Sequence, residues 1–74
     1  MLSKYVYAVG SYETRPQVKT IFGTSYNDAE ERIIEKYIEK YDIDTDFSTY
    51  EEFCDWMNEN LGIDFSDVED YDTI

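Results

Sequence analysis

The sequence has no histidine and only one cysteine, Cys54, among its 74 residues. A lone cysteine cannot form an internal disulfide, and without histidine the usual soft-metal ligand sets are unavailable. Long apolar runs are also missing, because the run from Tyr5 to Val9 is too short for a signal-peptide core or a membrane span. These absences exclude zinc and disulfide scaffolds. We expect a soluble protein of a reducing compartment, with no cofactor and no membrane partner.

Residues typical of catalytic sites are also scarce. Cys54 falls on the apolar side of an expected helix, with no cationic neighbour to lower its pKa, so we interpret it as a buried thiol. The three glycines are isolated, which leaves no Gly-rich phosphate loop. Carboxylates are abundant, but a pair acts as acid and base only when burial or a cleft separates the two pKa values. We therefore expect a protein that is not an enzyme.

Basic residues are absent from the second half of the chain. Residues 1–40 contain six basic and six acidic residues, whereas residues 41–74 contain twelve acids and no base. The net charge of -12 therefore lies entirely in the C-terminal part, where repulsion between acids costs stability. Solubility alone would be served by interspersed charges of both signs. The pattern favours a basic partner, and it disfavours direct binding of nucleic acid, whose phosphates these acids would repel.

The length leaves room for one domain, residues 1–74, with a thin core. A chain of this size buries only about 60% of the surface that it exposes when unfolded. Hydrophobic residues make up 42% of the sequence, which is enough for a globular fold and too many for a disordered acidic tail. We expect a single acidic domain, with a homodimer as an alternative to the monomer.

A β-hairpin is expected near the N-terminus. Tyr5 to Val9 alternates as a strand does, and the run from Val18 to Ser25 is β-branched and aromatic, with Ile21 and Phe22 on opposite faces. Pro16 lies between the two runs, where its fixed φ and missing N–H suit a turn.

A first helix is expected from about residue 28 to residue 41. Asn27 and Glu30 have the spacing of a capping box at its start. At 100° per residue, one arc of the helix is apolar and faces the hairpin. That arc contains Ile33, Ile34, Tyr37, Ile38 and Tyr41.

A second helix is expected from Thr49 to Leu61, where Ser48 and Glu51 have the spacing of a capping box and Gly62 suits the left-handed residue after a helix. Its apolar arc contains Tyr50, Phe53, Cys54, Met57 and Leu61. Trp56 falls outside this arc. Cover by the hairpin or the tail is the first interpretation of Trp56, and an anchor for a partner is the second.

The tail, residues 63–74, supports three interpretations: a third strand, a short helix or a partly ordered end. Ile63 and Phe65 alternate as in a strand, whereas Ser66 and Glu69 have the spacing of another capping box. The fold class expected is α+β, in which the N-terminal hairpin, with the tail as a candidate third strand, packs against two helices.

Three alternating aspartates, Asp42, Asp44 and Asp46, lie between the expected helices. Such a run is typical of a calcium loop, since hard cations bind several carboxylate oxygens. The sixth position of that loop is Phe47 where glycine is needed, and the twelfth is Phe53 where glutamate is needed. We interpret the run as an acidic connection and expect no metal site.

The acids of the second helix have a spacing that suits mimicry of phosphates. Glu51, Asp55 and Glu59 are four residues apart, which is about 6 Å along a helix and comparable to the spacing of phosphates along one strand. A solvated face that only keeps the protein soluble is the alternative. The candidate partner-binding residues are Asp42, Asp44, Asp46, Glu51, Glu52, Asp55, Trp56, Glu59, Asp64, Asp67, Glu69, Asp70 and Asp72.

The size, the acidity and the stretch Glu51-Glu52-Phe53-Cys54-Asp55-Trp56-Met57-Asn58 carry a resemblance. The chain resembles small acidic bacteriophage inhibitors, among them anti-restriction and anti-CRISPR proteins, and the eight-residue stretch is similar to an acidic helix of an anti-CRISPR inhibitor of Cas9. The resemblance implies a DNA mimic whose target is the basic channel that reads the protospacer-adjacent motif, in the cytoplasm of a bacterial host.

The function expected is inhibition of a basic nucleic-acid-binding protein, such as a CRISPR effector or a restriction enzyme. Its acids would compete with nucleic acid, and aromatic anchors such as Trp56, Tyr50 or Tyr71 would add desolvated contacts. An acidic adaptor or regulatory subunit, bound to a basic protein without nucleic-acid competition, is the alternative. Adaptation to high salt fits less well, because residues 1–40 are neutral.

Overall fold

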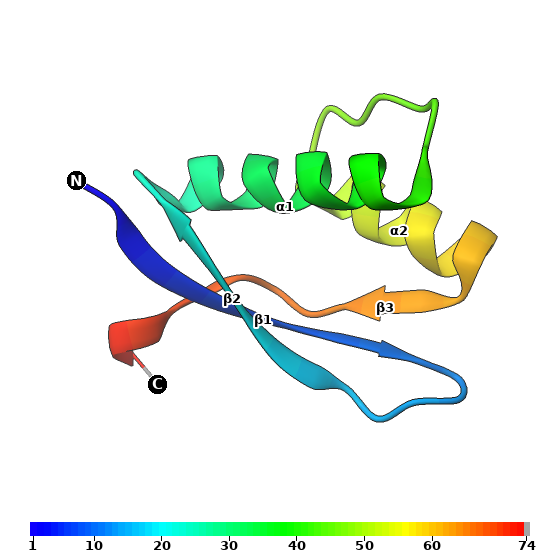
Figure 1. Ribbon diagram of the computed structural model, residues 1–74, viewed down its shortest axis with the longest axis horizontal. Coiled ribbons are helices and arrows are strands. Elements are labelled where there is room, and N and C mark those ends of the chain that lie inside the picture. Colours follow the sequence, from blue (N-terminus) through cyan, green and yellow to red (C-terminus); the bar gives the residue numbers. More distant parts are fainter. Residues whose placement is uncertain (74) are drawn as a thin grey trace.

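The computed structural model describes residues 1–73. Over these residues it is a four-stranded antiparallel sheet with two helices on one face (Figure 1). The elements, in chain order, are β1 (Ser3–Ser11), β2 (Gln17–Gly23), α1 (Tyr26–Tyr41), α2 (Tyr50–Leu61), β3 (Ile63–Phe65), β4 (Glu69–Asp70) and the 3-10 helix η1 (Tyr71–Thr73). The expected α+β fold, with an N-terminal hairpin packed against two helices, is confirmed. Within residues 1–73, neither helix is long and apolar enough to cross a membrane.

Strand β1 lies in the middle of the sheet. Along one side it pairs with β2, and along the other it pairs first with β3 and then with β4, all antiparallel. The tail therefore adds the strands β3 and β4 to the hairpin, so the interpretation of the tail as a strand is correct. The predicted capping box at Ser66 is wrong: the Ser66 hydroxyl accepts a hydrogen bond from the Ala8 N–H at 2.7 Å, so it joins the tail to β1.

The core lies between the sheet and the helices. Tyr5 and Tyr7 point from β1 toward the helices, and Phe53 of α2 is fully buried at its centre. The buried cluster consists of Tyr5, Tyr7, Ala29, Ile33, Ile34, Tyr37, Tyr50, Phe53, Met57 and Val68. The predicted apolar arcs were one turn too long, because Tyr41 and Leu61, in the last turn of each helix, are 40% and 43% exposed.

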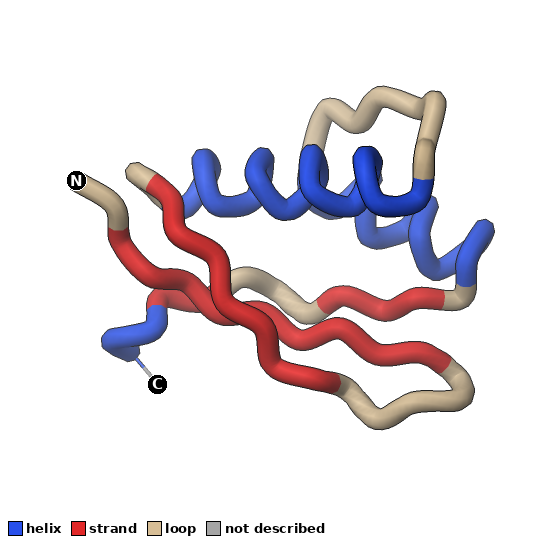
Figure 2. The backbone as a smooth tube through the Cα atoms, in the orientation of Figure 1, coloured by secondary structure: helices blue, strands red, loops and turns tan. Residues whose placement is uncertain are grey.

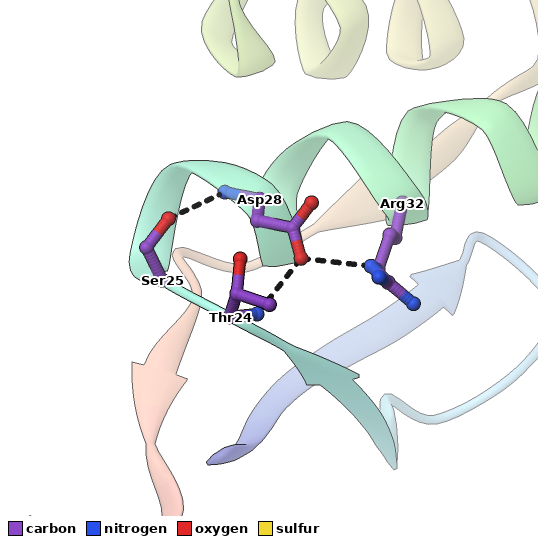
Figure 3. Close-up of polar contacts among 4 residues, drawn as sticks. All are labelled: Thr24, Ser25, Asp28 and Arg32. Carbon is purple, nitrogen blue, oxygen red and sulfur yellow. Dashed lines mark hydrogen bonds and ion pairs between the residues drawn. The ribbon is translucent and has the colours of Figure 1, made fainter. Parts of the chain in front are cut away.

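Helix α1 begins earlier than predicted. Ser25 is its N-cap: the Ser25 hydroxyl accepts from the Asp28 N–H at 3.1 Å, and the Asp28 carboxylate accepts from the Thr24 N–H at 2.8 Å (Figure 3). The predicted box from Asn27 is wrong because these bonds cap the helix two residues earlier. The hydrogen bond from the Thr24 N–H holds the pKa of Asp28 below its usual value. The Arg32 guanidinium, whose Nε lies 2.8 Å from the Asp28 carboxylate, adds to this effect.

Helix α2 also starts at a neighbouring cap. Thr49, and not Ser48, accepts the hydrogen bond from the Glu52 N–H, at 3.1 Å, and the Glu52 carboxylate accepts from the Ser48 N–H at 2.9 Å. Two overlapping patterns fit the sequence here, and the structure has the one that starts a residue later. Gly62 ends the helix with φ 66°, as predicted.

Candidate binding surface

The three alternating aspartates lie in the connection between α1 and α2. This loop stands clear of the sheet, on the outer side of the helices (Figure 2). Ile43 and Phe47 are half-buried against the core, whereas Asp42, Asp44 and Asp46 are all exposed. The loop therefore holds its apolar side chains inward and its carboxylates outward.

Asp42 has an unusual backbone conformation. It is the C-cap residue of α1 and has φ 53° and ψ 52°, in the left-handed region that costs most residues energy. Its charge also lies at the negative end of the helix dipole. Aspartate enters the left-handed region more readily than most residues, but a negative charge at this end of the helix is unfavourable.

The aspartates do not gather around a cation position. Within residues 1–73, no group of three or more histidine, cysteine, aspartate or glutamate side chains could hold a metal ion. The chemistry available to this loop is that of separate carboxylates facing water.

The acids of α2 are exposed and make no ion pair with any described residue. Glu51, Asp55 and Glu59 follow one another at intervals of a helical turn. Glu52 is exposed too, but its carboxylate caps the helix through Ser48, so part of its hydrogen-bonding capacity is already used. The carboxylates of residues 51, 55 and 59, unlike that of Glu52, therefore have no structural role among the described residues of α2.

A shallow hollow of about 250 Å³ joins this row to the tail. Asp55 and Glu59 of α2 line it together with Asp64 of β3. Asn58 donates a hydrogen bond to the Asp64 carboxylate, which holds β3 against the helix. Three carboxylates from two elements thus face one patch of solvent.

The other acids of the tail lie elsewhere. Asp67 and Glu69 line a different hollow, beside Val6 and Ala8 of β1. Asp70 accepts a hydrogen bond from the Asp72 N–H at 2.9 Å, within the end of the tail. Among the candidate acids of the tail, Asp64 is therefore the one that lines a hollow together with α2.

Carboxylates also approach one another at the start of α1. Glu30 is partly buried there, and its desolvation, with the charge of Asp67 added, raises its pKa above the usual value. Burial, and then Glu30 and Asp67, raise the pKa of the Tyr26 phenol as well. The Tyr26 hydroxyl donates to the Val68 carbonyl, which fastens the tail to α1. In this group the Tyr26 hydroxyl holds the tail, whereas the charges of Glu30 and Asp67 repel one another.

The aromatic residues named as anchors differ in exposure. Trp56 is half-buried, and Phe47 of the loop packs edge-on against it with 5.8 Å between the ring centroids. Tyr50 is only 8% exposed and donates a hydrogen bond to the Ser66 carbonyl, so its prediction as a contact anchor is wrong. Tyr71 is 49% exposed and remains accessible.

Cationic side chains collect on another part of the surface. Arg32, Lys36 and Lys40 of α1 line a hollow beside Ile21 of β2, interspersed with Glu35 and Glu39. The surface is therefore polarised, with mixed charges over α1 and β2 and carboxylates over the loop, α2 and β3.

Sequence analysis missed the side of the sheet opposite the helices. Val18 and Phe22 of β2 are 75% and 52% exposed there. The signal was present, because alternation in β2 places apolar residues on both faces of the hairpin.

Comparison of the chain with models of protein families, with curated proteins and with solved structures found no match.

Proposed function

We propose that the protein is a non-enzymatic inhibitor that occupies the basic groove of a nucleic-acid-binding enzyme, such as a CRISPR or restriction nuclease, in place of nucleic acid. The observation that carries the proposal is the patch of Asp55 and Glu59 of α2 with Asp64 of β3. Glu51 extends it by one helical turn. These carboxylates are exposed, come from two elements and have no cationic partner among the described residues.

The mechanism follows from electrostatics. A groove that binds DNA presents lysine and arginine side chains to a row of phosphates, and binding releases counterions. A row of unpaired carboxylates offers the same groove a negative surface. It would increase the rate of association at low ionic strength. Desolvated contacts from an aromatic anchor, for which half-buried Trp56 is a candidate, would set the lifetime of the complex. Such an inhibitor would act in the cytoplasm of a bacterial host.

The charge distribution supports a binding role over a general effect on solubility. Asp42 lies at the C-cap of α1, where the helix dipole disfavours a negative charge. Twelve acids without a base over residues 41–74 lower stability through repulsion. Features that reduce stability in this way are typical of functional surfaces.

The test is capture of proteins from a bacterial lysate by the tagged chain, with and without nuclease treatment and competitor DNA. The variant Glu51→Lys/Asp55→Lys/Glu59→Lys reverses the α2 row. Its matched control is Glu31→Lys/Glu35→Lys/Glu39→Lys, which makes the same change in net charge with exposed residues of α1. We expect a nucleic-acid enzyme that is displaced by DNA, is lost in the α2 variant and is retained in the α1 control.

Two outcomes would contradict the proposal. Capture that is indifferent to DNA would support the acidic adaptor, and equal losses in both variants would show that net charge alone is responsible. Inhibition of DNA cleavage by the purified captured enzyme, titrated at several salt concentrations, provides the direct readout, and the inhibition should weaken as salt rises.

A further inference from the structure

The face of the sheet opposite the helices exposes apolar side chains. Because Tyr5 and Tyr7 point toward the helices, alternation turns Val6 and Ala8 of β1 to the other face. The strand register then sets Val18 of β2 beside Ala8 and sets Phe22 beside Lys4 on that same face. Val18 is 75% exposed and Phe22 is 52% exposed, so apolar area of the hairpin faces solvent.

A hollow of about 490 Å³ opens on this face. Val6, Ala8 and Val18 line it from the hairpin, and Tyr71 lines it from the tail. Val6 is only 7% exposed, so the hollow reaches a side chain that the sheet and the tail nearly enclose. Its volume falls within the range of about 300–1,000 Å³ that is common for binding pockets.

The charged side chains that line the hollow are acidic. Asp67 and Glu69 both line it and are exposed, and neither makes an ion pair with a described residue. Lys4, on the same face, lies with its ammonium 4.2 Å from the centroid of the Tyr71 ring. An apolar hollow beside unpaired carboxylates offers complementary contacts to a segment that is both apolar and cationic.

We propose that this face is a docking site for a cationic amphipathic segment of a partner protein. An apolar side chain of the segment would enter the hollow between Val6 and Val18, and a neighbouring lysine or arginine would pair with Asp67 or Glu69. A second copy of the chain fits less well, because each copy has a net charge of -12. Nucleic acid would bring its phosphates against the same two carboxylates. Docking here uses none of the acids of α2, so it does not depend on the proposed inhibition.

The probe is a short peptide of alternating lysine and leucine, added to isotope-labelled protein at physiological ionic strength. A peptide of alternating lysine and serine has the same charge without the apolar side chains. We expect backbone amide shifts at Ala8, Val18, Glu69 and Tyr71 with the leucine peptide, and an affinity at least tenfold weaker for the serine peptide.

The variant Val18→Ser removes apolar area from a highly exposed position, so folding should be preserved and the amide spectrum would show it. Leu61→Ser is the matched control, because Leu61 is an exposed apolar residue in the last turn of α2. Val18→Ser should weaken binding of the leucine peptide about tenfold, and Leu61→Ser should leave it unchanged. In Asp67→Asn/Glu69→Gln, binding should weaken and lose much of its salt dependence.

Equal affinity for the two peptides, or shifts confined to α2 and the loop before it, would overturn the proposal, since either result would show attraction to charge alone. Concentration-dependent dimerisation that Val18→Ser abolishes would assign the face to a second copy instead. The reversed α2 row, Glu51→Lys/Asp55→Lys/Glu59→Lys, should still bind the leucine peptide at the sheet. Failure of the inhibitor test can thus be told apart from failure of this docking site.

Discussion

The phenol oxygens of Tyr7 and Tyr37 lie 3.3 Å apart, so a hydrogen bond joins the central strand to α1 inside the core. The two rings meet edge to face, with 6.4 Å between their centroids. Burial, and then this bond to Tyr37, raise the pKa of the Tyr7 phenol well above its usual value. The contact joins the two layers of the fold where both residues are almost fully buried.

Removal of one partner of this bond should destabilise the fold. Tyr7→Phe leaves the Tyr37 hydroxyl without this bond, at a cost of about 1 kcal/mol in the free energy of unfolding. The double variant Tyr7→Phe/Tyr37→Phe should lose less than the sum of the two single variants, because no hydroxyl is then left behind. Urea unfolding measures all three, and strict additivity would show that the two hydroxyls are not coupled.

The position of the cap on α2 can be tested by two neighbouring substitutions. Thr49→Ala removes the hydroxyl that accepts from the Glu52 N–H and should cost about 1 kcal/mol. Ser48→Ala should cost much less, because Ser48 contributes its backbone N–H to the cap and alanine keeps that group. Thermal unfolding of the two variants compares them, and a larger loss for Ser48→Ala would place the cap one residue earlier.

Cys54 should react slowly in the folded protein. Burial raises its pKa to about 11 from 9.0, although the neighbouring Tyr50 hydroxyl acts in the opposite direction. Because the pKa of the thiol is higher in the folded protein than in the unfolded chain by this amount, the folded protein holds about 100-fold less thiolate at pH 8. Alkylation by iodoacetamide should therefore be slower in the folded protein than in the urea-unfolded chain by a similar factor.

The same shift links Cys54 to stability. A folded-state pKa that is raised favours the folded protein while the thiol is protonated, and this contribution is lost as the pH rises from about 9 to 11. Cys54→Ser should flatten that part of the stability profile. A rate of alkylation equal to that of the unfolded chain would mean that the thiol is open to solvent.

Asp42→Gly should stabilise the protein. Glycine adopts φ 53° without the steric cost of a Cβ, which is roughly 1 kcal/mol, and part of this gain is offset by the greater freedom of glycine in the unfolded chain. The substitution also removes a negative charge from the C-terminal end of α1. Asp44→Gly, at an exposed position in the same loop, is the control and should not stabilise. If Asp42 contributes to binding, the more stable variant should bind its target less well.

Local patterns predicted the elements well because the relevant forces act over a few residues. Alternation identified β1 and β2, and glycine at position 62 identified the end of α2. The predicted N-caps differ from the observed ones by one or two residues. Overlapping patterns, such as Ser48/Glu51 and Thr49/Glu52, satisfy the same spacing rule for a capping box. Only the entry direction of the chain into the helix decides between them.

The candidate surface was less predictable because it depends on how distant segments meet. Asp64 lies beside Asp55 and Glu59 only because β3 pairs with β1 directly after α2 ends. Asp67 and Glu69, in the same acidic tail, lie on another face because the chain pairs again with β1 at β4. The sequence established the number of charges, and their grouping required the topology.

The central position of β1 has a consequence for how the protein is made. The first strand to be synthesised finds one neighbour, β2, within a few residues, but its other neighbours, β3 and β4, come at the far end of the chain. Contacts of such long sequence separation form late and slow folding. On a translating ribosome, β1 would remain open along one edge until the tail emerged, and an open strand edge of this kind can pair with other nascent chains.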